Sequence, residues 1–536
     1  MSRRQIVRDL VLVTAVALLL RTAAATIVSW PAYTDPAYYD LVAQRLATGH
    51  GFTAPVMWSF LEVGGSLPAD PHLPIPSNGH WMPLTSIVPA AFMALFGTSY
   101  GVAQIPMVIL STTLVPLTYV IGWHFWRSRR VAMGGAILAL FAGPLLLMYP
   151  QVANFAVFGV PGAVAIFAAC LSVEARRPGP WLVAASLAAG LATLARVDGV
   201  LLVVAPATAW LIRWRYAPSR WAIGTAVAWG MACASAYLLV VVPWLLRNMA
   251  TFGSAFPSAG GHTLWITSYN EQFSIGHQVT LDSYLAAGPI QVVGSKIGAL
   301  LELIGRTSVL LGGVFVVFFV FGLFRARRRP ELLPFVLTFT VVFVAMVLVF
   351  TFHAPRGAFY HSAPAWLPFA MPLAVAALPD TCRAGARWWR FLGRPRTHTF
   401  LLGAGLAGAV VLSVVGSLAI YAGWLEDRAV DQSAARLLQE AGATRAVVMS
   451  DDPASLWQLS GTPGIAMPAD PYPVLDAVIR AYGVEWIVVS LRHGATADPL
   501  GLWEGAESLD GGGNQATFLE SDPSFEAPNV RLYRVR

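Results

Sequence analysis

The sequence predicts a polytopic α-helical membrane protein of about eleven transmembrane helices, with interfacial helices on its outer side and a small soluble α/β domain at its C-terminus. Three observations predict this fold. Hydrophobic residues make up 56% of the 536 residues and charged residues only 12%, well below the roughly 25% of an ordinary globular chain. The mean hydropathy is +0.62. Residues 426–536 carry a net charge of −8, whereas residues 1–425 carry +15, nearly all of it as arginine.

Apolar runs long enough to cross a bilayer, which takes about 20 residues, recur along the chain. They lie at approximately 7–29, 100–124, 131–149, 154–173, 180–196, 199–213, 221–243, 307–324, 332–352, 361–379 and 399–422. The first run follows a basic start and ends near small residues, which also fits a cleaved signal peptide. Its length, the Arg21 inside it and the spans that follow favour an uncleaved first helix.

Arginine placement predicts which side of the membrane each connection occupies. If Met1 is cytoplasmic, the cytoplasmic segments hold 20 of the 35 basic residues, whereas the opposite short loops hold few. The cytoplasmic set is Arg3, Arg4, Arg8, Arg127, Arg129, Arg130, Arg176, Arg177, Arg213, Arg215, Arg220, Arg325, Arg327, Arg328, Arg329, Arg383, Arg387, Arg390, Arg394 and Arg396. The positive-inside rule therefore predicts a multi-pass protein of the cell membrane with a cytoplasmic N-terminus and an extracytoplasmic C-terminal domain.

The chain divides into a transmembrane domain, predicted over 1–424, and an extracytoplasmic α/β domain, predicted over 425–536. Two long outer segments, about 30–99 and 244–306, interrupt the spans. In the first, Leu84 to Phe96 is apolar but too short to cross comfortably, which favours an interfacial helix. The tail alternates helix and strand patterns. Its expected elements are helices at 429–441 and 472–482 and strands at 445–450, 485–490 and 530–535.

Asp35 stands just after the first span, among the aromatic residues of Tyr33–Asp40. Desolvation at a membrane surface raises the basicity of a carboxylate, which can then accept a proton from an attacking hydroxyl or amine. The Asp–Pro pair fits equally well a carboxylate that caps a helix starting at Pro36. On such a helix Asp40 would point about 140° away from Asp35, so the two should not share one task.

Several motifs resemble a known family. Asp35 with its aromatic neighbours, Arg45–Phe52, His80–Leu84 and Pro243–Asn248 look like outer-loop motifs of GT-C superfamily glycosyltransferases that use polyprenyl-phosphate sugars. The most similar branch is the bacterial group of the lipid A aminoarabinose transferases, which is related to protein O-mannosyltransferases. The resemblance covers roughly residues 7–380, and it implies the helical membrane fold described above.

The resemblance also implies an activity. Such an integral membrane glycosyltransferase moves a sugar from a polyprenyl-phosphate carrier to an acceptor lipid, glycan or protein on the extracytoplasmic side, with inversion and with Asp35 as base. The family usually has a second acid directly after this aspartate, where this chain has Pro36, and that departure puts metal binding by adjacent carboxylates in doubt. The lipid-linked donor is then a substrate and no cofactor is implied; a divalent metal stays an alternative that the histidine spacing does not favour.

A leaving phosphate requires fixed positive charge, because negative charge develops on its oxygens as the bond to the sugar breaks. Arg247 and Arg356 are the outer-side candidates, although Arg247 also fits an interfacial arginine that snorkels to lipid headgroups. The motifs around them supply the expected substrate-binding residues, which are Tyr38, Tyr39, His80, Trp81, Asn248, Tyr360 and His361. Arg196 and Asp198 are expected to form a structural ion pair at a hairpin.

A transporter or lipid-carrier flippase without group-transfer chemistry is the alternative function. Transporters usually carry internal repeats and broken helices with charges near mid-membrane, and we find no repeat between the halves of this sequence. No Gly-rich phosphate loop and no aromatic-basic pattern for nucleic acid is present. The sequence therefore favours the enzyme.

Overall fold

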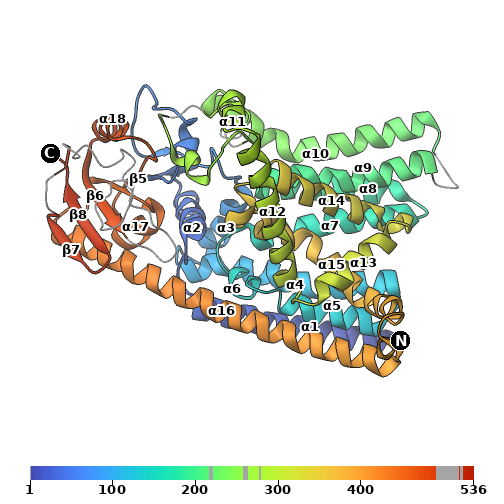
Figure 1. Ribbon diagram of the computed structural model, residues 1–536. Helices are drawn as coiled ribbons and strands as arrows, with labels where there is room; N and C mark the ends of the chain where they lie inside the picture. The colour runs from blue at the N-terminus through green and yellow to red at the C-terminus, as the bar shows by residue number, and fades with distance from the viewer. Residues whose placement is uncertain (1, 217–220, 258–263, 277–278, 491–517, 520–522) are drawn as a thin grey trace.

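The computed structural model describes residues 2–216, 221–257, 264–276, 279–490, 518–519 and 523–536. Long helices run side by side as a bundle, and a small sheet with its own helices packs against one end of it (Figure 1). The first helix starts at the opposite end (Figure 1). The protein therefore has a helical membrane part and a terminal α/β part, as the sequence predicts.

Nine helices or helical stretches in the described residues are long and apolar enough to cross a membrane. They are α1 (Arg3–Ile27), α4 (Tyr100–Trp126), α7 (Asn154–Glu174), α8 (Pro178–Ala195), Val197–Tyr216 with α9 (Val204–Leu211), α10 (Ile223–Phe252), Pro330–Leu348 with α14 (Leu333–Leu348), Ala354–Gly385 with α15 (Phe359–Gly385), and α16 (Pro395–Glu440). The bent pair α12 (Pro289–Leu310) and α13 (Phe315–Ala326) makes a tenth candidate. Exposed side chains such as Leu239 on α10, 73% accessible, suit helices whose outer face meets lipid.

Shorter elements connect these helices. They are α2 (Thr34–Ala47), β1 (Thr53–Ala54), β2 (Val56–Met57), η1 (Phe60–Val63), β3 (Ile75–Pro76), α3 (Leu84–Phe96), α5 (Arg129–Leu140), α6 (Leu145–Met148), η2 (Val197–Val203), η3 (Ile212–Tyr216), η5 (Tyr269–Phe273), α11 (Leu281–Ala286), η6 (Pro330–Leu332), η7 (Ala354–Ala358) and η8 (Arg390–Gly393). The helix expected at 84–96 is present as α3. It is a short apolar helix that packs against α2 and α4.

Two of the expected eleven spans are interrupted by a break between separate helices. The run at 131–149 is interrupted at Gly143–Pro144, which separates α5 from α6, because proline disrupts a helix interior. Ser413 of α16 donates a 2.7 Å hydrogen bond to the carbonyl of Phe141, and Arg21 of α1 donates to that of Leu140. These bonds satisfy carbonyls that the end of α5 leaves open.

The run at 307–324 bends by 104° between α12 and α13. Gly312 and Gly313 occupy the bend with φ of 72° and 78°, a left-handed conformation that glycine adopts without strain. A Cβ at Gly312 would lie 2.3 Å from Cβ of Ala409 on α16. The close approach of α16 therefore also requires a glycine here.

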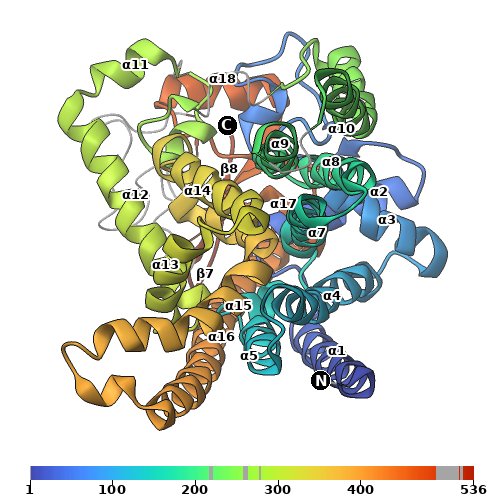
Figure 2. The same ribbon diagram turned by 90° about the vertical axis from the view of Figure 1, so that its right-hand side faces the viewer.

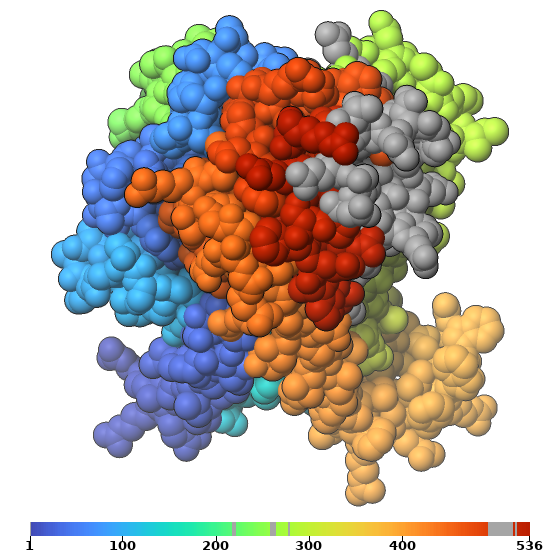
Figure 3. Space-filling model, turned by 90° about the vertical axis from the view of Figure 1, so that its left-hand side faces the viewer, coloured from blue at the N-terminus to red at the C-terminus, as the bar shows by residue number. Residues whose placement is uncertain are grey.

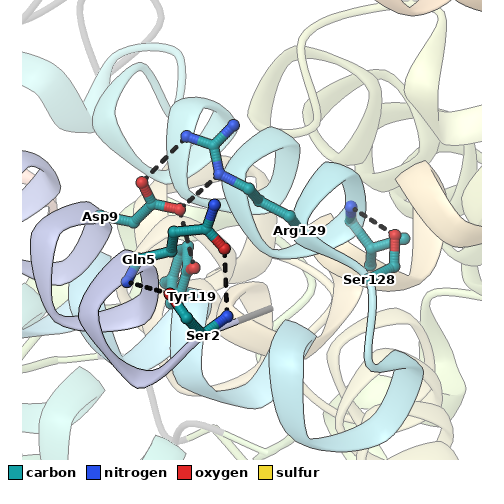
Figure 4. Close-up of polar contacts among 7 residues, drawn as sticks. Ser2, Gln5, Asp9, Tyr119, Ser128 and Arg129 are labelled. Carbon is teal, nitrogen blue, oxygen red and sulfur yellow. Dashed lines mark hydrogen bonds and ion pairs between the residues drawn. The ribbon is translucent and has the colours of Figure 1, made fainter.

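Helix ends that carry arginine residues meet at the end of the bundle that lies away from the sheet. This end of the bundle faces the viewer in Figure 2. Arg129 makes two hydrogen bonds of 2.6 and 2.9 Å to the buried carboxylate of Asp9 on α1, to which Tyr119 also donates (Figure 4). Arg130 donates a 3.1 Å bond to Thr399 near the start of α16. Three of the arginine-rich segments therefore lie together at this end.

In its described residues, the C-terminal domain contributes five strands to a six-stranded sheet and adds the helices α17 and α18 and the end of α16. Its described elements are β4 (Val447–Ser450), α17 (Pro453–Ser460), β5 (Gly464–Ala466), α18 (Tyr472–Tyr482), β6 (Val484–Ser490), β7 (Phe525–Ala527) and β8 (Val530–Arg534). The strand order is β2-β5-β4-β6-β8-β7, with the first four strands parallel. The expected helix at 472–482 and the three expected strands are present, nearly at their expected bounds.

Two connections join this domain to the membrane part. The expected division at 424/425 falls inside α16, a single helix of 46 residues that runs from the bundle into the domain. Strand β2 comes from the first outer segment and pairs with β5. Figure 3 accordingly has the first outer segment, in blue, directly beside the C-terminal domain, in orange and red.

Candidate active site

A cavity of about 410 Å³ lies between the outer segments and the outer ends of several spanning helices. Its walls come from the start of α2, the segments after β2 and β3, the starts of α7 and η2, the end of α10, η5, and the turn between α14 and α15. Residues far apart in the sequence therefore converge here, which is typical of a ligand site.

Asp35 lies in the first turn of α2 and lines this cavity. The helix begins at Thr34 with Tyr33 as N-cap and no side-chain capping bond, so the alternative that Asp35 caps the helix is wrong. The side chain is 25% exposed, and its Oδ2 lies 3.6 Å from Nε2 of His361. Burial raises the pKa of Asp35 to about 6; the nearby Asp452 also raises it, and Arg196 opposes the rise.

His361 links Asp35 to a short polar chain. Its Nδ1 bonds to the side-chain oxygen of Asn154, and the amide nitrogen of Asn154 donates a 3.3 Å bond to the hydroxyl of Tyr39. Because Asn154 presents its oxygen, Nδ1 of His361 is assigned as the donor, which leaves Nε2 unprotonated in the neutral ring. The ring stacks on Phe155 with centroids 4.0 Å apart. His361 therefore presents an acceptor nitrogen to Asp35.

Asp40, on the same helix, is fully buried and does not line the cavity. Its carboxylate accepts hydrogen bonds from Gln44 and Gln458, each of 2.8 Å. Burial raises its pKa to about 7, against these two bonds. The two acids of α2 therefore face different surroundings, as their spacing predicts.

The two outer arginines differ in position. Arg356 lines the cavity, is exposed, and has its guanidinium 5.0 Å from the centre of the Tyr269 ring. Arg247 does not line the cavity: its guanidinium packs 4.7 Å from the ring of Trp244 and donates a 3.0 Å bond to the carbonyl of Ser77. Asn248, beside it, does line the cavity.

An aromatic wall borders the cavity on the side of the first outer segment. The rings of Tyr39, Trp81 and Trp58 stack in that order, with centroid distances of 5.2 and 4.3 Å, and His80 lies 5.4 Å from Trp58. Burial lowers the pKa of His80 to about 3 and that of His353, across the cavity, to about 4. These histidines are neutral at neutral pH, so fixed positive charge in the cavity comes from arginine.

Two of the expected substrate-binding residues lie elsewhere. Tyr38 is buried and donates to Glu62, and burial raises the pKa of that carboxyl to about 8. Tyr360 lies under the guanidinium of Arg306, 4.6 Å away. Neither tyrosine lines the cavity, whereas Tyr39, His80, Trp81, Asn248 and His361 do.

The cavity also contains residues that the sequence does not single out as part of a site. Arg196 and Asp198 form the expected ion pair, at 2.8 Å, and Ser362 donates to the same carboxylate. Both charged residues line the cavity, as do Asn154 and Tyr269. The one available signal was the presence of the two charged residues Arg196 and Asp198 between adjoining apolar runs, since charges within a membrane domain usually pair or face a cavity.

Metal ligation has no cluster to support it in the described ranges. No three histidine, cysteine, aspartate or glutamate side chains in them are grouped so that they could hold a metal ion. Asp452 accepts bonds from the backbone N–H and hydroxyl of Ser455 and so caps α17.

No protein-family model and no curated protein matches the sequence. The structure is similar to that of ArnT from Cupriavidus metallidurans bound to undecaprenyl phosphate, with a TM-score of 0.57 and 15% identity over 98% of this chain and 97% of ArnT. It is also similar to the Archaeoglobus fulgidus oligosaccharyltransferase, with a TM-score of 0.57 and 12% identity over 90% of this chain and 68% of that one.

A second structure of the archaeal enzyme AglB contains an inhibitory peptide and a dolichol-phosphate, and matches with a TM-score of 0.50 and 12% identity over 91% of this chain and 69% of that one. All three solved structures are of GT-C glycosyltransferases. The structural similarity covers at least 90% of this chain in each comparison, and in ArnT it covers nearly the whole of both chains. The protein therefore has the fold of the GT-C membrane glycosyltransferases.

Proposed function

We propose that this protein is an integral membrane glycosyltransferase that moves a sugar from a polyprenyl-phosphate carrier to an acceptor. The observation that carries the proposal is the meeting of Asp35, His361 and Arg356 around one cavity, in a fold shared with enzymes that bind undecaprenyl or dolichol phosphate. A base and a phosphate-binding cation in one cavity are the groups that glycosyl transfer from a phosphate requires.

Asp35 acts as the general base in this proposal. The acceptor oxygen attacks the anomeric carbon on the face opposite the phosphate, so the configuration inverts. Its proton passes to the carboxylate of Asp35 as the new carbon–oxygen bond forms. Nε2 of His361 lies 3.6 Å from this carboxylate and presents an acceptor nitrogen toward it, and the base is restored when Asp35 gives the proton up to water. The raised pKa of Asp35, about 6, is closer to the working pH and so makes it a stronger base.

Arg356 binds the leaving phosphate in the same proposal. The bond between the anomeric carbon and the phosphate oxygen breaks with its electron pair, and the carrier departs as polyprenyl phosphate. Arg356 is exposed at the rim of the cavity over Tyr269, where a carrier phosphate can reach it. Arg196, inside the cavity, adds a second guanidinium whose charge is shared with Asp198.

The reaction takes place on the extracytoplasmic side. The cavity is built from the outer segments and the adjoining ends of spanning helices, while three arginine-rich segments lie at the other end of the bundle. Because arginine-rich loops stay in the cytoplasm, the cavity opens to the opposite side. The acceptor is a lipid, glycan or protein of the cell envelope.

The test is a donor panel. Purified protein in lipid is incubated with radiolabelled polyprenyl-phosphate sugars and a cell-envelope extract that supplies lipid, glycan and protein acceptors, and the release of free polyprenyl phosphate is followed. We expect release with at least one sugar, and release about 10²–10⁴-fold slower with Asp35→Asn. If the carrier-linked sugar crosses the membrane intact and polyprenyl phosphate is released from none of the donors, the result would instead support a flippase.

A further inference from the structure

The C-terminal domain contacts the walls of the cavity through the segments that follow two of its parallel strands. Asp452 follows β4 and Asp470 follows β5, and the two acids are only 3% and 2% exposed. Functional groups usually gather at the carboxyl ends of parallel strands. Here that edge of the sheet bonds to the two outer segments of the membrane part.

Asp452 bonds to the residue before Asp35. Its Oδ2 accepts a 2.7 Å hydrogen bond from the hydroxyl of Thr34, while its Oδ1 accepts from the backbone N–H of Ser455. On the same helix α17, Gln458 donates a 3.1 Å bond to the carbonyl of Ala37. Two side chains of the C-terminal domain therefore hold the first turn of α2, in which Asp35 lies.

Asp470 bonds to the second outer segment at three consecutive residues. Its Oδ1 accepts from the hydroxyl of Ser274, at 2.5 Å, and from the N–H of Gly276, at 3.1 Å; its Oδ2 accepts from the N–H of Ile275, at 2.6 Å. Bonds to a carboxylate are about twice as strong as bonds between neutral groups. Five residues before this contact lies Tyr269, the residue beneath Arg356.

The same segment is also held by packing and by backbone contact. A Cβ added at Gly276 would lie 2.9 Å from the side chain of Val474 on α18, so the backbone lies directly against that helix. The N–H of Ala469 donates a 3.2 Å bond to the carbonyl of Phe273. Contacts with the C-terminal domain therefore help to fix the position of Tyr269, in addition to contacts with the helical bundle.

We propose that the C-terminal domain is a positioning scaffold for the reaction, in which Asp452 fixes the helical turn of Asp35 and Asp470 fixes the segment of Tyr269, the ring against which Arg356 packs. This inference rests on the proposed function. Neither acid lines the cavity, so both are positioning residues, not catalytic ones. A displacement of about 1 Å at a reacting group can cost on the order of 100-fold in rate, so small losses of order in either segment have large effects.

The test uses two nearly isosteric variants of the full-length protein in lipid. Thr34→Val keeps the shape of Thr34 but removes its donor to Asp452, and Asp470→Asn replaces an acceptor oxygen with an N–H group that cannot accept from Ile275. Asp476→Asn is the matched control. Asp476 is a surface acid of the same domain, and it forms a 3.0 Å ion pair with Arg480 on its own helix. Donor dissociation constant, single-turnover transfer rate, melting temperature and hydrogen exchange are measured for each.

Thr34→Val should slow transfer on the order of tenfold with an unchanged donor dissociation constant, because it loosens the base and not the phosphate site. Asp470→Asn should weaken donor binding on the order of tenfold. Each should raise hydrogen exchange in its own segment, 34–47 or 264–276, and the control should change neither. If Asp470→Asn does not fold, Ser274→Ala removes one donor to the same carboxylate and takes its place.

Two results would overturn the inference: unchanged exchange in both segments, or raised exchange with transfer rate and donor binding equal to those of Asp476→Asn. The second result would mean that the domain only stabilises the outer segments. A wild-type protein that binds no polyprenyl-phosphate sugar would refute the proposed function instead. The exchange measurement would then still decide whether the two acids hold these segments.

Discussion

Gln458 of α17 and Asp40 of α2, which are 418 residues apart, are joined by a 2.8 Å hydrogen bond from Nε2 to Oδ2. Gln44 donates a second 2.8 Å bond to the same oxygen, while Oδ1 of Asp40 is buried without a hydrogen-bond partner in the part of the chain that the structure describes. Burial raises the pKa of Asp40 to about 7. The interface between the two domains therefore contains a carboxyl group whose charged form is disfavoured.

Asp40→Asn should stabilise the protein at alkaline pH. The folded state binds a proton at Asp40 up to about pH 7, whereas an unfolded aspartate loses its proton near pH 4, so the wild-type protein loses stability as the pH rises from 4 to 7. Asparagine carries no charge and still accepts from both glutamines. The difference in melting temperature between variant and wild type should be small at pH 4.5, grow up to pH 7 and then level off. The corresponding free energy is about 1.4 kcal/mol for each unit by which the pKa of Asp40 differs between the folded and the unfolded state.

The measurement is a set of thermal melts in lipid nanodiscs between pH 4.5 and 8.5. Asp476→Asn, a surface change in the same α/β domain, is the control and should show no such trend. Other buried acids, such as Glu62, affect wild type and variant equally and cancel in the difference. A variant less stable than wild type at pH 8 would mean that the interface requires the charge.

The sequence predicts the spans and the tail well because each depends on local patterns. Long apolar runs identify nine of the helices. Strand-like runs identify β4 and β6, and alternation identifies β8. The breaks within 131–149 and 307–324 are missed because hydropathy is insensitive to backbone conformation. Both breaks contain glycine, at Gly143 and at Gly312–Gly313, but glycines are common within the other spans too.

The site is predicted only in part, because its geometry depends on contacts between distant segments. Asp35 and Arg356 could be identified from their residue types and from the side of the membrane on which the sequence predicts them, and both line the cavity. The partnership of His361 with Asn154 joins residues 207 apart, and the pairing of β2 with β5 joins segments about 400 apart. No local pattern encodes such pairs.

Arg356→Gln and Arg247→Gln should have different effects. Arg356 lines the cavity, so the loss of its charge should weaken binding of a polyprenyl-phosphate sugar about tenfold or more, since charge-assisted bonds to phosphate are strong. Arg247 packs on Trp244 and bonds to the carbonyl of Ser77, so its loss should lower stability by about 1–3 kcal/mol. Donor titration and thermal melts on both variants separate the effects. Equal loss of donor affinity in Arg247→Gln would assign the phosphate to both arginines.

A cysteine at Gln439, exposed on the last turn of α16, should react with a membrane-impermeant thiol reagent in intact cells. A cysteine at Arg328, exposed at the arginine-rich end, should react only after the membrane is permeabilised. Cys170 and Cys382 are buried and Cys233 is partly exposed, so the wild-type protein supplies the background. Labelling of the two positions in the reverse order would invert the topology.

Asp35→Asn should transfer sugar about 10²–10⁴-fold more slowly, which is the usual contribution of a positioned base, with donor binding and melting temperature close to those of wild type. Asparagine keeps the shape but cannot take the proton, and α2 has no side-chain cap to lose at this residue. Single-turnover transfer and donor titration on the same preparation measure both quantities. Near-wild-type transfer would exclude Asp35 as base.

The rate of transfer should rise with pH through about 6. A base works when it is unprotonated, and burial raises the pKa of Asp35 to about 6, so about half of the maximal rate is expected near that pH. The groups around it shift this midpoint in known directions: the charge of Asp452 raises it, and the charge of Arg196 lowers it. His361, at 3.6 Å, presents an unprotonated nitrogen.

Asp452→Asn should therefore move the midpoint of this pH profile to lower pH, because the removed negative charge no longer favours protonation of Asp35. Arg196→Gln should move it to higher pH, because the removed positive charge no longer opposes that protonation. Melting curves at each pH exclude unfolding as the cause. Opposite shifts from two variants on different elements would assign the titrating group to Asp35, since loss of stability lowers the rate without moving the midpoint in two directions. An unmoved midpoint in both variants would place the titrating base elsewhere.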